Sequence, residues 1–523
     1  MKPYKILLYL LSIFLLLAVV SFIFPKDGFY IGNNLLLRFP DIQQFTSFHQ
    51  SDQKKIQDIL DTQQLNFLSD SNNFHTSDSI ISQDDSAFMV PDSLKAEIKT
   101  DTLSISDSTE KKKQEKAPGS IHQHIEYPEN DKSVLYPFFN HLRNLKNSGE
   151  LIRVLHYGDS QIEGDRITSY IRNELQQQFG GSGVGMFPSV LIKGTSISLH
   201  HQLAGSWERY TIKSIENGNI YHKRLGALMS FGRFAPVYAR SKDLYAGEIT
   251  LKKSNISYLR TREFKRCRVF YGFNEKPFIA ELKHKAQTLD AELIPPSHQL
   301  QTLSWNIDGS VNEITISFRG EDSPDIYAIA IDGHKGVAVD NIPLRGSSGT
   351  DFTRTDMAFF RSMYQKLNAK LIIMQFGVNL VPHIIEDYSY YEKQFYKQLK
   401  TLKGLHPDIC IIVIGVSDMS RNVMGRYESY PNIEKIRDAQ KNAAFRAGCA
   451  FWDMYEAMGG KNSMPAWVNA TPPLAKTDFT HLTWKGSVII SKMFYDAFIN
   501  DYFEYINNKN SLAKYKLDEV TKD

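Results

Sequence analysis

Short apolar runs alternate with longer amphipathic stretches over residues 126–194 and 336–508. The apolar runs lack the polar alternation of a half-exposed strand, which is typical of strands buried on both faces of a parallel sheet. Strands separated by helices predict a doubly wound α/β domain, with a parallel sheet flanked by helices. Buried strands are predicted at 151–155, 371–376 and 408–415, a short edge strand at 449–453, and helices at 134–145, 167–179, 386–403, 434–447 and 485–502.

Between residues 195 and 335 the pattern changes to a period of two, with turn residues between the segments. Such alternation indicates antiparallel strands with one buried face. We therefore expect an all-β sandwich inserted into the α/β domain, which resumes at 336 and ends at 508, before a tail at 509–523. The alternating segments are 248–251, 267–271, 278–282, 313–318 and 327–331.

The N-terminus has the pattern of a membrane anchor. Lys2 and Lys5 precede an uncharged stretch at 6–24, which as a helix covers roughly 28 Å, about one hydrocarbon core. A cleaved signal peptide is the alternative, but no small-residue cleavage site follows the stretch. We expect a retained single span at 1–24, with the lysines cytoplasmic and the bulk of the chain on the extracytoplasmic, periplasmic side.

Residues 25–125 are predicted to be a juxtamembrane segment and linker. A short amphipathic helix is expected at 43–66. Residues 69–120 are rich in Ser, Asp, Lys and Gln and have few aromatic side chains, so they bury too little apolar surface to fold. This stretch is interpreted as a tether for the folded domain.

Composition excludes some classes of function. A formal net charge of +3 over 523 residues gives no basis for nucleic-acid binding. The cysteines, Cys267, Cys410 and Cys449, fit no metal-binding spacing and imply no disulfide framework, and Cys410 lies in an apolar run typical of a buried thiol.

Candidate chemistry begins where the run at 151–155 leads into Gly158, Asp159 and Ser160. A serine at a strand-to-helix turn exposes its hydroxyl at the carboxyl end of the strand. Its backbone N–H lies at a helix N-terminus, where negative charge is favoured. These features suit a nucleophile whose reaction forms an oxyanion. A capped turn without catalysis is the alternative, because Asp and Ser are common before helices.

Three distant segments supply possible partners. Asp478 and His481 are three residues apart, so the carboxylate can hold one ring nitrogen while the other accepts the serine proton. Asn379 follows a buried strand, at the sheet edge where open α/β sheets bind ligands. Residues 345–350 form a glycine-rich turn that can offer a backbone N–H. Each segment alone is also compatible with an ordinary loop.

In this order, the four segments resemble the blocks of the SGNH (GDSL-like) hydrolase family. The resemblance implies that Ser160 is the nucleophile, with Asp478 and His481 as its relay. The oxyanion donors would be the N–H groups of Ser160 and Gly349 and the amide of Asn379. Gly346 is the competing assignment for the second block. The remaining matches are Gly377 in the third block and Gly486 after the last.

Two positions depart from the family pattern. Gln161 occupies the position of the leucine in the GDSL motif. Leu380 follows Asn379, at the position where many members carry Asp. The first difference is expected to affect the pocket lining, and the second removes a common local support. Neither removes a catalytic role.

The layout over 130–505 resembles a subgroup that removes O-acetyl groups from cell-wall or other polysaccharides, in which a β-sandwich interrupts the catalytic domain. The resemblance implies a serine esterase that needs no metal or cofactor and acts on an acetylated glycan. One alternative is an O-acetyltransferase that works with a membrane acyl-donor partner. Another is a non-catalytic glycan-binding protein. The inserted sandwich can bind sugar through exposed aromatics or bury them in its core; the candidates are Trp207, Tyr210, Tyr271 and Trp305.

Overall fold

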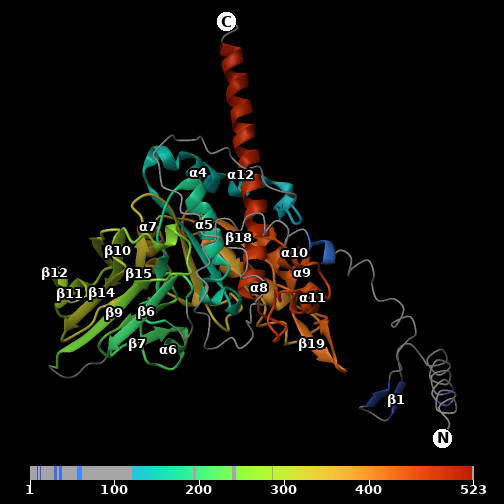
Figure 1. Ribbon diagram of the computed structural model, residues 1–523, viewed down its shortest axis with the longest axis horizontal. Coiled ribbons are helices and arrows are strands. Elements are labelled where there is room, and N and C mark those ends of the chain that lie inside the picture. The colour runs from blue at the N-terminus through green and yellow to red at the C-terminus, as the bar shows by residue number, and fades with distance from the viewer. Residues whose placement is uncertain are drawn as a thin grey trace, which may run out of the picture. The chain divides into compact units, whose positions relative to one another are not determined.

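The computed structural model divides the chain into two compact units, Met1–Leu65 and Asn66–Asp523. In the first unit the described residues include an antiparallel hairpin of β1 (Phe29–Ile31) and β2 (Leu35–Leu37). The second unit contains the folded domain (Figure 1). The described residues are 9, 12, 29–31, 35–37, 56–59, 61, 121–191, 196–237, 243–285 and 287–520, with side chains given up to 509 except in the β1–β2 hairpin.

Little of the N-terminal region is described. Of the predicted span at 6–24, only Tyr9 and Ser12 are among the described residues, and the predicted linker at 69–120 lies outside them. Residues 56–59 and 61, within the amphipathic helix predicted at 43–66, are helical. In the part of the chain that the structure describes, no helix is both long enough and apolar enough to cross a membrane.

A mixed sheet of six strands forms the centre of the larger unit, in the order β16-β4-β17-β18-β21-β3. The five strands from β16 to β21 run parallel, and β3 is antiparallel to β21. β17 and β18 are buried along their whole length, and β4 at every residue after its first, because helices cover both faces. Their bounds are β3 (Ile125–Glu126), β4 (Leu151–Gly158), β16 (Gly336–Pro343), β17 (Ala369–Gln375), β18 (Cys410–Ile414) and β21 (Ala450–Trp452).

Two groups of helices sandwich this sheet. α7 (Met357–Leu367), α8 (Ser389–Lys403) and α9 (Ile433–Arg446) share one apolar core with the sheet. α4 (Tyr136–Ser148), α5 (Thr168–Phe179) and α12 (Trp484–Val520) pack together through aromatic side chains. The short helices are α10 (Met454–Met458) and α11 (Ser463–Asn469).

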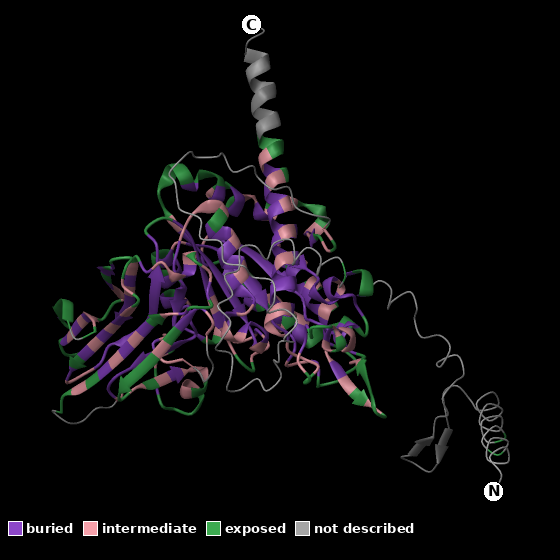
Figure 2. Cartoon of the chain, viewed as in Figure 1, coloured by how far each residue is buried: buried purple, intermediate pink, exposed green. Residues whose placement is uncertain are grey.

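The insertion consists of two antiparallel sheets (Figure 1). One contains β5 (Gly185–Phe187), β7 (Glu208–Thr211), β8 (Ser230–Arg233), β10 (Arg266–Gly272), β13 (Gln301–Asn306) and β15 (Asp325–Asp332). The other contains β6 (Leu199–Gly205), β9 (Tyr245–Lys253), β11 (Phe278–His284), β12 (Gln287–Ile294) and β14 (Glu313–Gly320). An apolar cluster fills the space between the two sheets, while side chains of the first sheet also join the core formed with α7. Figure 2 shows in purple the buried residues of both sheets. The insertion therefore shares a core with the α/β domain.

The fold class predicted from the sequence is confirmed for the α/β domain and its inserted β sheets. Several boundaries differ. The insertion begins at β5, ahead of residue 195, because Gly185–Phe187 pairs with β15. The strand predicted at the sheet edge, β21, is interior because β3 covers it. The closing helix predicted at 485–502 continues through the expected tail to residue 520.

The buried positions agree with the sequence patterns. Tyr210, Tyr271 and Trp305 are buried, and the partly buried Trp207 packs against the sandwich core, which confirms the core interpretation of these aromatics. Cys410 is a buried free thiol, as expected, and so are the other two cysteines.

Candidate active site

Ser160 lies at the carboxyl end of β4, where it opens a short 3₁₀ segment, η5 (Ser160–Asp165). The preceding residue, Asp159, is buried, and its carboxylate accepts hydrogen bonds from the backbone N–H groups of Gln161 (3.0 Å), Gly377 (3.1 Å) and Val378 (3.3 Å). Burial raises the pKa of Asp159 to about 6, although these hydrogen bonds act in the opposite direction. Asp159 thus caps the nucleophile turn and joins it to the loop after β17.

His481 lies between Ser160 and Asp478. Its Nε2 is 2.8 Å from Ser160 Oγ, and its Nδ1 is 2.8 Å from Asp478 Oδ2. The other carboxylate oxygen accepts the N–H groups of Thr480 (3.0 Å) and His481 (2.9 Å). Partial burial acts to raise the pKa of Asp478, but the His481 ring and these two N–H groups lower it to about 2. A negative charge is therefore fixed beside Nδ1, which leaves Nε2 to accept a proton from Oγ.

Two side chains from the nucleophile segment hold the loop of Asp478 and His481. Gln161 Nε2 donates to the Thr480 carbonyl at 2.6 Å and to Ser417 Oγ at 3.1 Å. Arg166 donates from Nη1 to the Leu482 carbonyl and from Nη2 to the Ser160 carbonyl, both at 3.2 Å. Gln161 was expected to line the pocket, whereas here its side chain is buried and anchors a loop.

A hairpin supports the same loop from another side. It consists of β19 (Ser420–Val423) and β20 (Arg426–Ser429). The Ser420 N–H donates to the Phe479 carbonyl at 3.0 Å, and the ring of Tyr427 is stacked on that of Phe479 with an interplanar angle of 4°. Phe479 has a φ of +53°, an uncommon conformation for a bulky residue, so these contacts hold the loop against backbone strain.

Two of the three predicted oxyanion donors, Asn379 and Gly349, are bonded to Ser347 in this structure. Asn379 Nδ2 donates to the Ser347 carbonyl at 2.9 Å, and the Gly349 N–H donates to Ser347 Oγ at 3.0 Å. An amide nitrogen carries two protons, so Asn379 keeps a second N–H for a ligand, whereas the single N–H of Gly349 is already used. Like the competing Gly346, Gly349 has a positive φ.

Close packing explains two of the glycines in the blocks. A Cβ at Gly349, where φ is +78°, would lie 2.8 Å from Phe376. A Cβ at Gly486 would lie 1.9 Å from the Leu474 carbonyl oxygen. α12 can therefore begin directly after the His481 loop only because this position has no side chain.

Sequence reasoning did not find the anchoring roles of Asp159, Gln161 and Arg166. The capped-turn interpretation came close for Asp159, because its side chain does cap η5. The other two contact carbonyl groups more than 300 positions away along the chain (319 for Gln161 to Thr480 and 316 for Arg166 to Leu482). No local pattern marks such contacts.

The chain is similar to a solved structure described as "Peptidoglycan O-acetylesterase in action, 5 min". It has a TM-score of 0.56 and 21% sequence identity, and the match covers 70% of this chain and 96% of the other. A putative GDSL-like lipase from Parabacteroides merdae ATCC 43184 has a TM-score of 0.24 and 15% identity, over 31% of this chain and 72% of its own. No protein-family model and no curated protein matches the sequence. The first match shows a shared fold that includes the inserted region.

Proposed function

We propose that this chain, which has the fold of the SGNH/GDSL-like hydrolases, is a serine esterase that removes O-acetyl groups from a cell-envelope glycan. The observation that carries the proposal is the unbroken hydrogen-bond path from Ser160 through His481 to Asp478, with 2.8 Å at each step. A glycan-binding protein has no use for such a proton relay. The fold shared with a peptidoglycan O-acetylesterase supports the same class of ester.

In the proposed reaction, Ser160 Oγ attacks the ester carbonyl carbon while His481 Nε2 takes the hydroxyl proton. The new carbon–oxygen bond makes a tetrahedral oxyanion. When this intermediate collapses, the ester bond to the sugar breaks, and His481 returns the proton to the departing sugar hydroxyl. Water then attacks the acetyl-serine by the same steps and releases acetate. Asp478 orients the ring and stabilises its charged form in both halves.

The oxyanion needs donors that are in place before the charge forms. The Ser160 N–H and the second amide N–H of Asn379 are proposed to serve. The Asn379 side chain is held by the Ser347 carbonyl, so it is already fixed before substrate binds. Gly349 was predicted to contribute as well, but its N–H would first have to leave Ser347 Oγ. One such donor is typically worth about 10²–10³ in turnover.

The location of the enzyme is also a proposal. The lysines before the uncharged stretch at 6–24 favour an extracytoplasmic catalytic domain, where envelope glycans are found.

The test measures acetate release by the full-length chain from O-acetylated glycans, peptidoglycan among them, with Ser160→Ala as the control. We expect rapid release by the wild type and a loss of about 10⁶-fold in turnover in the variant, because the nucleophile is gone. Mass spectrometry should detect an acetyl group on Ser160 during turnover. Wild-type rates from Ser160→Ala would refute the proposal. Transfer of acetyl to an added oligosaccharide in preference to water would identify a transferase instead.

A further inference from the structure

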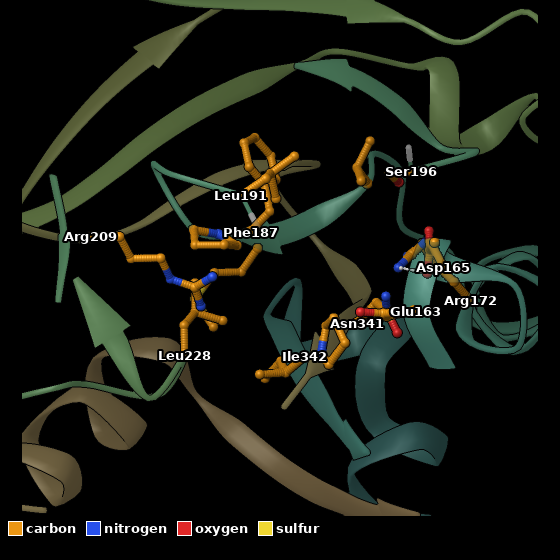
Figure 3. A pocket seen from close by; sticks show the side chains of 15 residues that line it. Glu163, Asp165, Arg172, Phe187, Leu191, Ser196, Arg209, Leu228, Asn341 and Ile342 are labelled. Carbon is orange, nitrogen blue, oxygen red and sulfur yellow. Dashed lines mark hydrogen bonds and ion pairs between the residues drawn. The ribbon is translucent and has the colours of Figure 1, made fainter. Parts of the chain in front are cut away.

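A cavity of about 100 Å³ lies between the catalytic domain and the insertion, beside the segment that carries Ser160 (Figure 3). Glu163 and Gly164 of η5 form part of its wall, together with Ile342 and Pro343 at the end of β16. Pro343 is in register with Gly158, two residues before the nucleophile. Three trans peptide steps separate Ser160 from Glu163, so their Cα atoms are at most about 11 Å apart. This proximity favours contact of one extended glycan with both places.

The insertion contributes an arginine to this cavity. Arg209 of β7 points into it from one side, while Glu163, Asp165 and Arg172 lie on the opposite side (Figure 3). Nη2 of Arg209 donates to Ser230 Oγ at 3.2 Å, but its Nε and Nη1 are buried without a hydrogen-bond partner. Around it the wall is largely apolar, with Met186, Phe187 and Leu228.

No acidic side chain among the described residues is paired with Arg209. Asp165 is bound by Arg172 through both carboxylate oxygens (2.6 and 3.0 Å), and Glu163 lies 3.5 Å from Arg345. The short undescribed segments within the folded domain, 192–195, 238–242 and 286, contain no Asp or Glu, whereas the undescribed stretch 62–120 before the domain contains several. Burial lowers the pKa of Arg209 to about 10, so the guanidinium is still cationic at neutral pH.

A partly buried cation with two inaccessible and unused donors is costly unless something pairs with it. A carboxylate is the best match, because two parallel N–H groups can bind its two oxygens. The cavity is large enough for several water molecules, and therefore also for a small carboxylate-bearing substituent. We propose that Arg209 binds a carboxylate of the substrate, so that the enzyme acts on O-acetylated acidic glycans. This inference rests on the proposed esterase function.

The test compares Arg209→Met with the wild-type full-length chain on three substrates. These are an O-acetylated uronic-acid polymer, the same polymer after reduction of its carboxyl groups to alcohols, and 4-nitrophenyl acetate. On the acidic polymer we expect KM to rise roughly 10- to 100-fold with little change in kcat, because the lost contact binds a part of the substrate that does not react. The reduced polymer and the small ester should not distinguish the two proteins.

Controls separate binding from folding. Arg319→Met changes an exposed arginine of β14 and should alter none of these values. Arg209→Met should keep the wild-type melting temperature or exceed it, because methionine removes an unpaired buried charge. Arg209→Lys retains the charge but loses the paired donors, and should give an intermediate KM. A fall of several degrees in Arg209→Met would show a structural ion pair and overturn the inference.

A binding measurement distinguishes failure of the carboxylate site at Arg209 from failure of the proposed esterase function. Titration of a deacetylated acidic oligosaccharide into the wild type should show binding that Arg209→Met weakens roughly 10- to 100-fold, whether or not acetate is released. Equal KM and equal affinity in both proteins would overturn the carboxylate site while leaving the esterase intact. Faster cleavage of longer acyl esters by Arg209→Met would make the cavity an acyl pocket instead.

The carboxylate has two plausible sources, a uronic acid in the sugar chain or the stem peptides of peptidoglycan. Acetate release from O-acetylated peptidoglycan, before and after amidation of its peptide carboxylates, distinguishes them. A rise in KM in Arg209→Met that disappears on amidation would show that Arg209 binds the peptide carboxylates. A rise in KM in Arg209→Met that is seen only with the uronic-acid polymer would show that Arg209 binds the carboxylate of the sugar.

Discussion

The turn that carries Ser160 and the loop that carries His481 meet at the catalytic hydrogen bond, yet the chain holds them by different means. The turn continues a strand that is buried at every residue after its first, and its cap, Asp159, is buried and bonded to three backbone N–H groups. The loop lies at the surface, and the side chain of Asp478 is 46% exposed. Its conformation depends on contacts with Gln161, Arg166 and the β19–β20 hairpin.

This difference shows that separate segments position the nucleophile and the proton relay. The buried turn fixes where the nucleophile stands, because moving it would disrupt the central sheet. The loop fixes where the proton goes, and its position is set by a few polar contacts that single substitutions can remove. We therefore expect changes in the loop and its anchors to reduce activity more than stability, and we expect the two carboxylates to respond to pH in opposite directions.

Within the loop, the largest effect is expected for Asp478→Asn. The amide oxygen can still accept the N–H groups of Thr480 and His481, but an amide NH₂ in place of Oδ2 cannot accept from Nδ1. The ring should then adopt the wrong tautomer, and kcat should fall by about 10⁴-fold. Acetate-release kinetics measure this.

The control is Asp387→Asn, another exposed aspartate in a turn, which accepts from Ser389 and lies outside the site. It should retain wild-type kcat. If Asp478→Asn also kept most of its activity, the carboxylate would have no part in the relay.

An intermediate effect is expected for Gln161→Leu, which introduces the leucine of the GDSL motif. The Thr480 carbonyl loses its 2.6 Å donor, so the loop is held less firmly and kcat should fall about tenfold. The free energy of unfolding should drop by about 1–2 kcal/mol. Turnover measured well below both melting temperatures, together with urea unfolding, gives the two values.

Gln176→Leu is a matched control on α5. Gln176 is equally buried and donates to the Gly183 carbonyl at 3.2 Å, away from the loop. A similar loss of stability with unchanged kcat is expected there. Equal losses of activity in both variants would mean that Gln161 acts through stability alone.

The smallest effect concerns stability against pH. Asp478 has its pKa lowered to about 2, so its contribution to stability is present above pH ~4 and is lost as the pH falls toward 2. Asp159 has its pKa raised to about 6, so its contribution is full below pH ~4 and is lost as the pH rises through 6.

Unfolding free energies measured from pH 2 to 7 test this contrast. The advantage of the wild type over Asp478→Asn should shrink below pH ~4, and its advantage over Asp159→Asn should shrink between pH ~4 and 6. Parallel curves for the wild type and either variant would show that the carboxylate in question has the same pKa folded and unfolded.

The sequence by itself determined the fold class and the segments of the candidate site. Apolar runs report burial and amphipathic stretches report helices, and both are properties of neighbouring residues. The strand before Ser160, the turn after it and the three-residue spacing of Asp478 and His481 are local in the same sense. For this reason the sequence located the four blocks and five of the inserted strands, β9, β10, β11, β14 and β15, whereas β5, β6, β7, β8, β12 and β13 were not predicted.

Only the tertiary structure decided how those segments are held and what lies beside them. Gln161 and Thr480 are 319 positions apart, and β5 joins the insertion only by pairing with β15. The cavity around Arg209 exists because the insertion packs against the end of β16 and η5. Each of these contacts depends on the packing of distant elements, and no short-range pattern in the chain encodes which polar groups meet there.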